Sequence, residues 1–221
     1  MINFNDLYLE PLSIDGYAKL RNGLIQQTKF FEKKKEYTPD YVDKRYNSYG
    51  ELSVRMSYLR LGFLLGALDK PVRKILDVGY GNGDFLNVAK DYLPECCGFE
   101  VNGYSVPEGC EFIHDIYEEE FDVACFFDVL EHFDNIYDIK KLDAKYIYIS
   151  VPECHFISED WFEHWKHRRP DEHLWHFRKD SLEAFMGEIG YSLLAYSNVE
   201  DAIRKPEDHL SNILSGVFKR T

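Results

Sequence analysis

The chain has 221 residues, of which 39 are acidic and 26 basic, giving a formal net charge of −13. This acid excess disfavours a protein that follows a nucleic-acid backbone, because that affinity comes from clustered lysine and arginine side chains. Hydrophobic residues make up 45% and charged residues 29% of the chain. These are ordinary globular values, and the chain is long enough to bury a full core.

Cysteine usage and hydropathy indicate the compartment. The five cysteines are Cys96, Cys97, Cys110, Cys125 and Cys154, with no CxxC pair among them. Two are adjacent, a poor geometry for a mutual disulfide, so we expect reduced thiols. The amino terminus has no basic-then-apolar signal pattern, and the apolar stretch at 61–68 is far shorter than the roughly 18 residues of a membrane span. The sequence therefore predicts a cytoplasmic protein that does not enter a membrane.

The first elements of the chain precede a change of pattern near residue 70. Residues 1–50 are polar and rich in tyrosine, whereas residues 51–68 place apolar side chains at three- and four-residue spacing. That spacing is typical of an amphipathic helix, and Pro71 follows it as expected beyond a helix end. We describe residues 1–70 as an N-terminal helical extension.

From residue 71 onward, short apolar runs alternate with helical stretches. The predicted strands are 74–79, 96–101, 110–115, 121–129, 145–152, 191–199 and 212–220, and the predicted helices are 84–93, 135–143 and 180–190. This alternation predicts a doubly wound, mainly parallel α/β sheet, with the last two strands as an antiparallel pair at one edge. We expect one domain over 1–221, with its core at 71–221 and an aromatic lid insertion at about 153–176.

A glycine cluster follows the first strand of the core. The segment LDVGYGNGDF places Asp77 before Gly79, Gly81 and Gly83. Glycines at such a turn let the backbone approach a ligand, and the helix start beyond them presents free N–H groups. The dinucleotide fingerprint has its third glycine five residues after the first, whereas here the interval is four. Asp77 is an awkward neighbour for pyrophosphate but suits a cation or the ammonium of an amino acid.

With these residues the chain resembles the class I S-adenosylmethionine-dependent methyltransferases, whose first motif is an acid followed by GxGxG. Further stretches match the family in order: Glu100 after the second strand, HDI at 114–116, FFDVLEH at 126–132, and HLWHF at 173–177 before the last helix. The last two are most similar to the small-molecule, ubiquinone-biosynthesis-like branch. The resemblance covers roughly residues 50–221 and implies a Rossmann-like fold with seven strands.

The resemblance also implies a site for the cofactor S-adenosylmethionine at the carboxyl edge of the sheet. Its expected residues are Asp77, Gly79, Tyr80, Gly81, Gly83, Glu100, Asp115, Ile116, Asp128 and Arg55. In this family, Glu100 would contact the ribose, Asp115 the adenine amine and Arg55 the methionine carboxylate. From the residues alone, the acids also fit structural roles at turns, strand ends and helix starts, and Arg55 fits an exposed helix face.

Histidines are concentrated after the fifth core strand. His164, His167, His173 and His176 form two HxxH pairs, a spacing that can place two imidazoles on one helix face to bind a metal. Pro170 separates the pairs, and the family needs no metal, so we expect no metal site. We predict His173 and His132 as catalytic residues that orient or deprotonate the acceptor. The alternative for His173 is a structural histidine, and His132 fits an ordinary helix start.

The combined prediction is an S-adenosylmethionine-dependent methyltransferase with a small-molecule acceptor, and oxygen as the preferred methylated atom. Methylation of protein or nucleic acid is an alternative within the enzyme class, although the segment DVLEH differs from the amino-methylating NPPY-type signature. A nicotinamide-dependent oxidoreductase and a catalytically silent cofactor-binding protein also remain open. Besides the acceptor, the expected partners include neither membrane nor nucleic acid, and a homodimer is left open.

Overall fold

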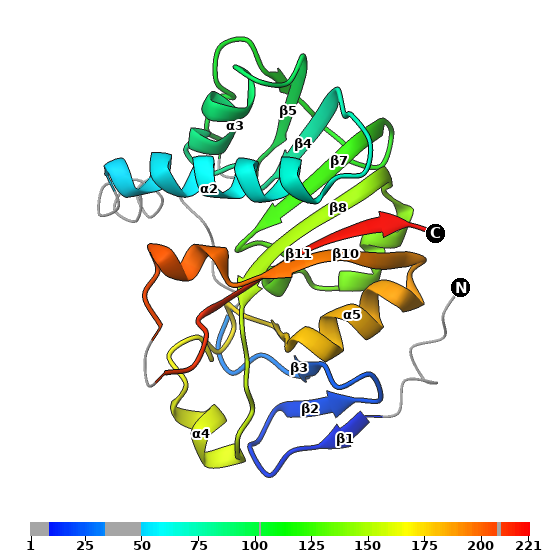
Figure 1. The fold of residues 1–221 in the computed structure, drawn as a ribbon. Coiled ribbons are helices and arrows are strands. Elements are labelled where there is room, and N and C mark those ends of the chain that lie inside the picture. Colours follow the sequence, from blue (N-terminus) through cyan, green and yellow to red (C-terminus); the bar gives the residue numbers. More distant parts are fainter. Residues whose placement is uncertain (1–8, 34–49, 102, 207–208) are drawn as a thin grey trace.

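The computed structural model describes residues 9–33, 50–101, 103–206 and 209–221 (Figure 1). Its centre is a seven-stranded sheet in the order β10-β11-β8-β7-β4-β5-β6. The strands are β4 (Lys74–Val78), β5 (Glu95–Phe99), β6 (Glu111–Phe112), β7 (Glu120–Phe127), β8 (Asp143–Pro152), β10 (Tyr191–Ser197) and β11 (Ile213–Arg220). Neighbours from β6 to β8 are parallel, and β11 pairs antiparallel with β8 and β10. The predicted doubly wound, mainly parallel sheet with an antiparallel edge is confirmed.

Helices cover both faces of this sheet because its central strands are apolar on both sides. In β7, Phe126 belongs to the core on one face, and its neighbour Phe127 belongs to the core on the other. Helices α2 (Glu51–Ala67) and α3 (Asp84–Ala89) pack on the Phe127 face, and α5 (Lys179–Glu188) packs on the Phe126 face. Figure 1 shows the sheet between these two layers.

A second, smaller sheet is formed by the N-terminal segment. Strands β1 (Leu9–Pro11), β2 (Tyr17–Leu20) and β3 (Ile25–Gln27) pair antiparallel in sequence, and β3 pairs with β9 (Trp175–His176). The prediction of a helical extension is therefore wrong for residues 9–27. It is confirmed where α2 lies, and residues 1–8 and 34–49 are outside the described part of the chain.

Turns and burial explain why this segment forms strands. Gly16 and Gly23 have φ of 79° and 88°, a backbone region that glycine enters without the penalty of a Cβ. Each therefore reverses the chain between neighbouring strands. Tyr17, Leu20 and Ile25 are at most 3% exposed, because the small sheet packs against the segment after β8 and against α5. Such short strands gain stability only from these long-range contacts.

Several predicted elements are shorter than their patterns suggested. The predicted helix at 84–93 ends at Ala89, and the predicted strand at 110–115 pairs only at Glu111 and Phe112. Residues Ile136–Lys141 form the 3-10 helix η3 in place of an α-helix, and α5 begins at Lys179, with Asp180 inside its first turn. The remaining elements are η2 (Leu130–His132), α4 (Glu159–His164) and η4 (Val199–Ala202).

The segment 153–176, expected to be a lid, is tied to the N-terminal sheet. The Asp171 carboxylate accepts hydrogen bonds from the backbone N–H groups of Phe31 and Glu32 at 3.0 and 2.8 Å. The Gln27 side chain donates to Asp171 Oδ1 at 2.6 Å and accepts from the Asp171 N–H at 2.9 Å. Phe162 is fully buried and meets Tyr17 edge-to-face. These contacts anchor the segment to the N-terminal sheet in the structure. Its mobility as a lid stays a prediction.

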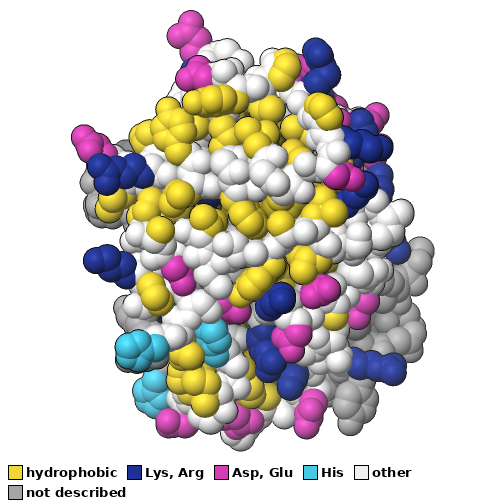
Figure 2. Space-filling view, viewed as in Figure 1, with side chains coloured by type: hydrophobic (Ala, Val, Ile, Leu, Met, Phe, Trp, Pro, Cys, Tyr) yellow, Lys and Arg dark blue, Asp and Glu magenta, His cyan; other side chains and the backbone are white. Residues whose placement is uncertain are grey.

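The surface around α2 carries exposed apolar side chains. Leu52, Val54, Tyr58 and Leu65 are each at least 40% exposed. Figure 2 shows hydrophobic side chains gathered on this face, with histidine and basic side chains farther down. None of the described helices combines the length and the apolar character that crossing a membrane requires.

Candidate active site

The loop after β4 requires glycine for two separate reasons. Gly79, Gly81 and Gly83 have φ of 71°, 58° and 80°, all in the left-handed region. A Cβ on Gly79 would also lie 2.6 Å from the Val129 side chain, and one on Gly83 would lie 2.5 Å from Pro107. The loop is thus held tightly between the segments that follow β5 and β7. The packing of the protein therefore fixes the backbone shape of this loop.

Glu100, directly after β5, fastens this loop. Its carboxylate accepts hydrogen bonds from the N–H of Gly81 at 2.8 Å and from the N–H of Val101 at 2.7 Å. The predicted juxtaposition of the glycine loop with Glu100 is therefore present. It follows from parallel pairing of β4 with β5, which brings their carboxyl ends to the same edge.

Asp77 lies at the same edge but is almost fully buried, at 2% exposure. Among the described residues, its Oδ1 atom has no hydrogen-bond partner. Burial raises the pKa of this carboxyl to about 8, with Arg60 opposing the shift and Glu100 adding to it. A buried acid lacking a donor is costly, so this position favours a ligand that brings positive charge or N–H donors.

The residues expected around the adenine, Asp115 and Ile116, follow the next strand of the sheet, β6. Ile116 is buried, and Asp115 is exposed, with Oδ1 accepting the N–H of Tyr117 at 2.9 Å. The Tyr80 ring is 5% exposed, and its hydroxyl donates to the backbone oxygen of Tyr104. These residues follow β6 and β4, so they lie along the same edge as Glu100.

Asp128 lies directly after β7 in a backbone conformation uncommon for a side-chain-bearing residue, with φ of 55°. Its N–H donates to Ser150 O at 2.8 Å, which holds the end of β7 against β8. Both carboxylate oxygens accept from Arg204 Nη1, at 2.9 and 2.7 Å. Strained positions of this kind are typical of functional sites.

Sequence analysis missed an ion-pair network around Asp128. Arg60 on α2 donates through Nε and Nη2 to the two oxygens of Glu200, at 2.7 and 3.0 Å, and its Nη2 lies 3.5 Å from Asp128 Oδ2. Arg204 Nη1 also lies 3.2 Å from Glu200 Oε2. Glu200 is fully buried. In this network the positive charges of the two arginines balance the negative charges of Glu200 and Asp128.

The predicted Arg55 does not join this group. It is exposed on α2, five residues before Arg60, a spacing that turns the two side chains about 140° apart around the helix. The available signal was the helical periodicity: Arg60 lies four residues from the buried Met56 and from the buried Leu64. Arg55, in contrast, lies three residues from the exposed Leu52 and from the exposed Tyr58. The partners Glu200 and Arg204 carried no comparable signal.

The histidines converge near the same edge. His132 Nδ1 donates to Glu172 O at 2.7 Å, because a carbonyl oxygen can only accept, and this places the lone pair of a neutral ring on Nε2. The His132 and His173 rings meet edge-to-face at 4.8 Å. Burial lowers the pKa of His173 well below 6.5, and neighbouring His132 and His176 act in the same direction. The two predicted catalytic histidines thus lie together.

A metal-binding geometry is also found in this group. In the described part of the chain, ligand atoms of Glu131, His132 and His173 all lie within 4.8 Å of one another. This trio, and not the two HxxH pairs, could hold an ion: His164 is exposed on α4, whereas His176 is buried among aromatic rings. The expectation of a metal-free site stays a prediction.

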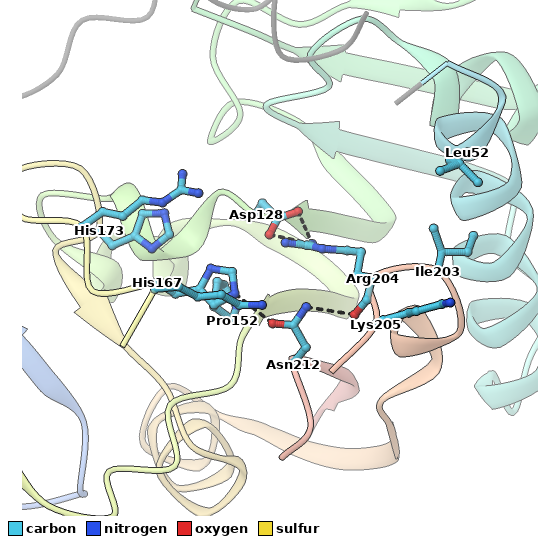
Figure 3. A pocket seen from close by; sticks show the side chains of 11 residues that line it. Leu52, Asp128, Pro152, His167, His173, Ile203, Arg204, Lys205 and Asn212 are labelled. Atoms are coloured by element: carbon cyan, nitrogen blue, oxygen red, sulfur yellow. Dashed lines mark hydrogen bonds and ion pairs between the residues drawn. The ribbon is translucent and has the colours of Figure 1, made fainter. Parts of the chain in front are cut away.

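A pocket of about 280 Å³ opens beside Asp128 (Figure 3). Its described lining residues are Leu52, Asp128, Pro152, Lys166, His167, Arg169, His173, Ile203, Arg204, Lys205 and Asn212. Asp128 and Pro152 lie where β7 and β8 end, so the pocket is at the carboxyl edge of the sheet, next to the strand that carries the glycine loop.

This arrangement agrees with a family comparison. Residues 46–196 match the model of a protein family described as a methyltransferase domain, over more than half of the chain. The chain belongs to this family. It is an S-adenosylmethionine-dependent methyltransferase, and S-adenosylmethionine is its cofactor. A search of curated protein sequences finds no match to this methyltransferase.

Solved structures show the same fold. The methyltransferase is similar to magnesium protoporphyrin IX methyltransferase from Synechocystis PCC 6803 with bound SAH, at 13% identity and TM-score 0.57, over 83% of this chain and 96% of that one. It is also similar to an S-adenosylmethionine-dependent methyltransferase from Clostridium acetobutylicum ATCC 824, at 11% identity and TM-score 0.56, over 80% and 98% of the two chains. The plantazolicin methyltransferase BamL, with SAH, matches at 14% identity and TM-score 0.55, over 82% and 90%.

The residues at the edge of β4 and β5 fit the cofactor. The Oδ1 atom of the buried Asp77 carboxyl has no donor among the described residues, so this group suits a methionine ammonium. The glycine loop supplies a side-chain-free approach to the backbone, and Glu100 adds carboxylate oxygens beside it. These are the groups that a cationic amino acid joined to a ribose requires of its site.

Proposed function

We propose that this methyltransferase acts on a small-molecule acceptor and methylates an oxygen atom in preference to nitrogen or carbon. One observation carries the proposal: the pocket beside Asp128 holds two buried imidazoles, His167 and His173. At about 280 Å³ it lies near the lower end of the range for small-molecule sites. A pocket of this size accommodates a small molecule and not a folded partner.

The cofactor end of the site is assigned to the segments that follow β4, β5 and β6. Asp77 receives the methionine ammonium, Glu100 the ribose hydroxyls, and Asp115 with Ile116 the adenine. When bound, S-adenosylmethionine supplies an activated methyl carbon. The protein's own task is to align the acceptor with that carbon, exclude water, and take up a proton where the acceptor is a hydroxyl.

Proton uptake is assigned to the histidine pair. His173 is buried and held neutral, so it has a lone pair for a proton from the acceptor. His132 meets it edge-to-face, with its orientation set by the hydrogen bond to Glu172 O. A neutral amine attacks through its own lone pair without first losing a proton, and most carbon acids hold their proton too tightly for an imidazole to remove. The pair therefore favours a hydroxyl acceptor. In this assignment His173, which lines the pocket, touches the acceptor, and His132 acts through it as a positioning residue.

Two alternatives are separated from the proposal by one experiment. The purified protein is titrated calorimetrically with S-adenosylmethionine and S-adenosylhomocysteine. It is then incubated with a library of hydroxylated, amino and carbon-acid small molecules and, in separate reactions, with protein and with nucleic acid, while S-adenosylhomocysteine formation is followed. We expect binding of both ligands and turnover with hydroxylated compounds. Binding without turnover of any small molecule would favour a silent binding protein, and turnover only with protein or nucleic acid would overturn the small-molecule assignment.

A further inference from the structure

A buried carboxylate and two imidazoles meet between two segments that are far apart in the chain. Glu131 and His132 belong to η2, which follows β7, whereas His173 lies just before β9. Glu131 and His173 are almost fully buried. In the described part of the chain, ligand atoms of these three residues all lie within 4.8 Å of one another. We call them the Glu131 trio.

Two hydrogen bonds hold the two segments together at this point. The Leu174 N–H donates to Glu131 O at 2.7 Å, and His132 Nδ1 donates to Glu172 O, also at 2.7 Å. The second bond leaves the lone pair of a neutral His132 ring on Nε2, which lies 3.9 Å from Glu131 Oε1. Metal-binding histidines usually donate their other ring N–H to a carbonyl or carboxylate oxygen in this way. Contacts to the backbone therefore position the Glu131 trio without an ion.

The spacing of the Glu131 trio is close to what zinc requires. Three atoms that lie within 4.8 Å of one another share a point at most about 2.8 Å (4.8 Å divided by √3) from each of them. Zinc bonds to imidazole nitrogen and carboxylate oxygen are about 2.0–2.2 Å long. Side-chain movements of less than about 1 Å therefore bring all three ligand atoms to bonding distance.

The ligand set also selects among metal ions. Two imidazoles and one carboxylate are typical ligands of Zn²⁺ sites that keep an open coordination position, whereas Mg²⁺ prefers oxygen ligands and water. His173 lines the pocket beside Asp128, which gives an ion access to the Glu131 trio (Figure 3). Arg169, another lining residue, is paired with Glu172 at 3.2 Å, so the Glu172 carboxylate offsets its repulsion of a cation.

We propose that Glu131, His132 and His173 bind Zn²⁺ and that the bound ion inhibits methyl transfer. The inhibition rests on the proposed function, because His173 is the residue assigned to the acceptor proton. A neutral imidazole has a single lone-pair nitrogen, and a ring that coordinates an ion through it cannot take up a proton there. Zinc binding and proton uptake therefore exclude each other at His173, and the active enzyme is the one without the ion.

The test uses the full chain after treatment with a chelator that is then removed. Calorimetric titrations with zinc chloride and magnesium chloride measure binding, and turnover of the best acceptor is measured with and without zinc. Glu131→Gln removes the ligand charge at nearly constant shape. His132→Asn, which keeps a donor for Glu172 O but removes the Nε2 ligand, replaces it if the first variant does not fold. The matched control is Glu163→Gln, an exposed glutamate of α4, and melting temperatures confirm folding.

We expect saturable binding of zinc but not of magnesium, with turnover that falls as zinc binds and returns when a chelator is added. In Glu131→Gln, zinc affinity should fall about tenfold or more, and the zinc concentration for half inhibition should rise with it, whereas the control should match the wild type. Absence of zinc binding, full zinc affinity in the Glu131 variant, or turnover raised by zinc would overturn the inference. If no acceptor is turned over, the proposed function fails, and the zinc titrations alone uphold or overturn the metal site.

Discussion

Arg204 Nη1 contacts both carboxylate oxygens of Asp128, at 2.9 and 2.7 Å, although 76 positions separate the two residues in the chain. The contact joins the segment after η4 to the end of β7, so the pocket wall and the cofactor-facing edge are one connected structure. Glu200 links the same arginine to α2 through Arg60. A change in this network is therefore expected to affect both stability and the shape of the site.

Replacing Arg60 with methionine should lower the free energy of unfolding by about 3–5 kcal/mol, because it leaves the buried Glu200 with one cation fewer. The variant also loses the stacking of the guanidinium on the Phe127 ring, 4.3 Å from its centroid. Urea unfolding measures the change. Arg55→Met on the same helix is the matched control and should cost less than about 0.5 kcal/mol, since Arg55 is exposed. Equal losses in the two variants would contradict the network.

Binding of S-adenosylmethionine at pH 7 should release up to one proton from Asp77. Without ligand, burial raises the pKa of Asp77 to about 8, so the carboxyl is mostly protonated at pH 7. An ammonium beside it stabilises the carboxylate and lowers that pKa, so affinity should increase as pH rises toward 8. Calorimetry in buffers of different ionisation enthalpy counts the proton, and Asp77→Asn should abolish the release. A binding enthalpy that does not vary with buffer would argue against the ammonium contact.

Glu100→Ala should weaken S-adenosylmethionine binding by about 1.5–3 kcal/mol, the range for hydrogen bonds to a charged group. The substitution removes the acceptor for the Gly81 and Val101 N–H groups as well as the ribose contact. Glu95→Ala, an exposed acid at the other end of β5, serves as control. Unchanged affinity in a folded Glu100 variant would remove the ribose assignment.

His173→Ala should lower turnover much more than it lowers cofactor affinity, because the imidazole is assigned to the acceptor. Cofactor affinity, melting temperature and turnover are measured on the same preparation, with the exposed His164→Ala as control. If His173 is instead a structural histidine, melting temperature, affinity and turnover should fall together. Full turnover in the variant would end the catalytic assignment.

The protein should lose stability in acid partly through His176. Burial lowers the pKa of His176 to about 3. As pH falls below 6.5, the imidazole is therefore protonated in the unfolded chain but stays neutral in the folded chain. The contribution of His176 to the free energy of unfolding is complete above pH 6.5 and is lost as pH falls toward 3. The loss relative to pH above 6.5 is about 2 kcal/mol at pH 5. His176→Phe keeps a ring beside Phe162 and should remove that share of the loss. Urea unfolding at pH 7 and pH 5 compares wild type and variant; identical pH dependence would refute the prediction.

Local sequence determined the cofactor edge of this protein. Asp77 and the three glycines lie within a few residues of one another, so strand, turn and helix start follow from short-range preferences and from the backbone freedom of glycine. The position of Glu100 then followed from a general rule, because neighbouring parallel strands bring their carboxyl ends together. Strands β4, β7 and β8 were recognisable from their apolar runs, because strands buried on both faces are apolar throughout.

Tertiary structure decided the N-terminal sheet and the pocket. Strands β1 to β3 are three or four residues long, and what stabilises them is pairing with β9 and burial against α5, about 150 positions away, which no local periodicity encodes. Arg60, and not Arg55, joins the ion-pair network around Asp128, because Glu200 lies 140 positions later and receives Arg60 in the folded chain. The pocket beside Asp128 arises in the same way: its described lining residues belong to segments far apart in the chain, and only the fold brings them around one cavity.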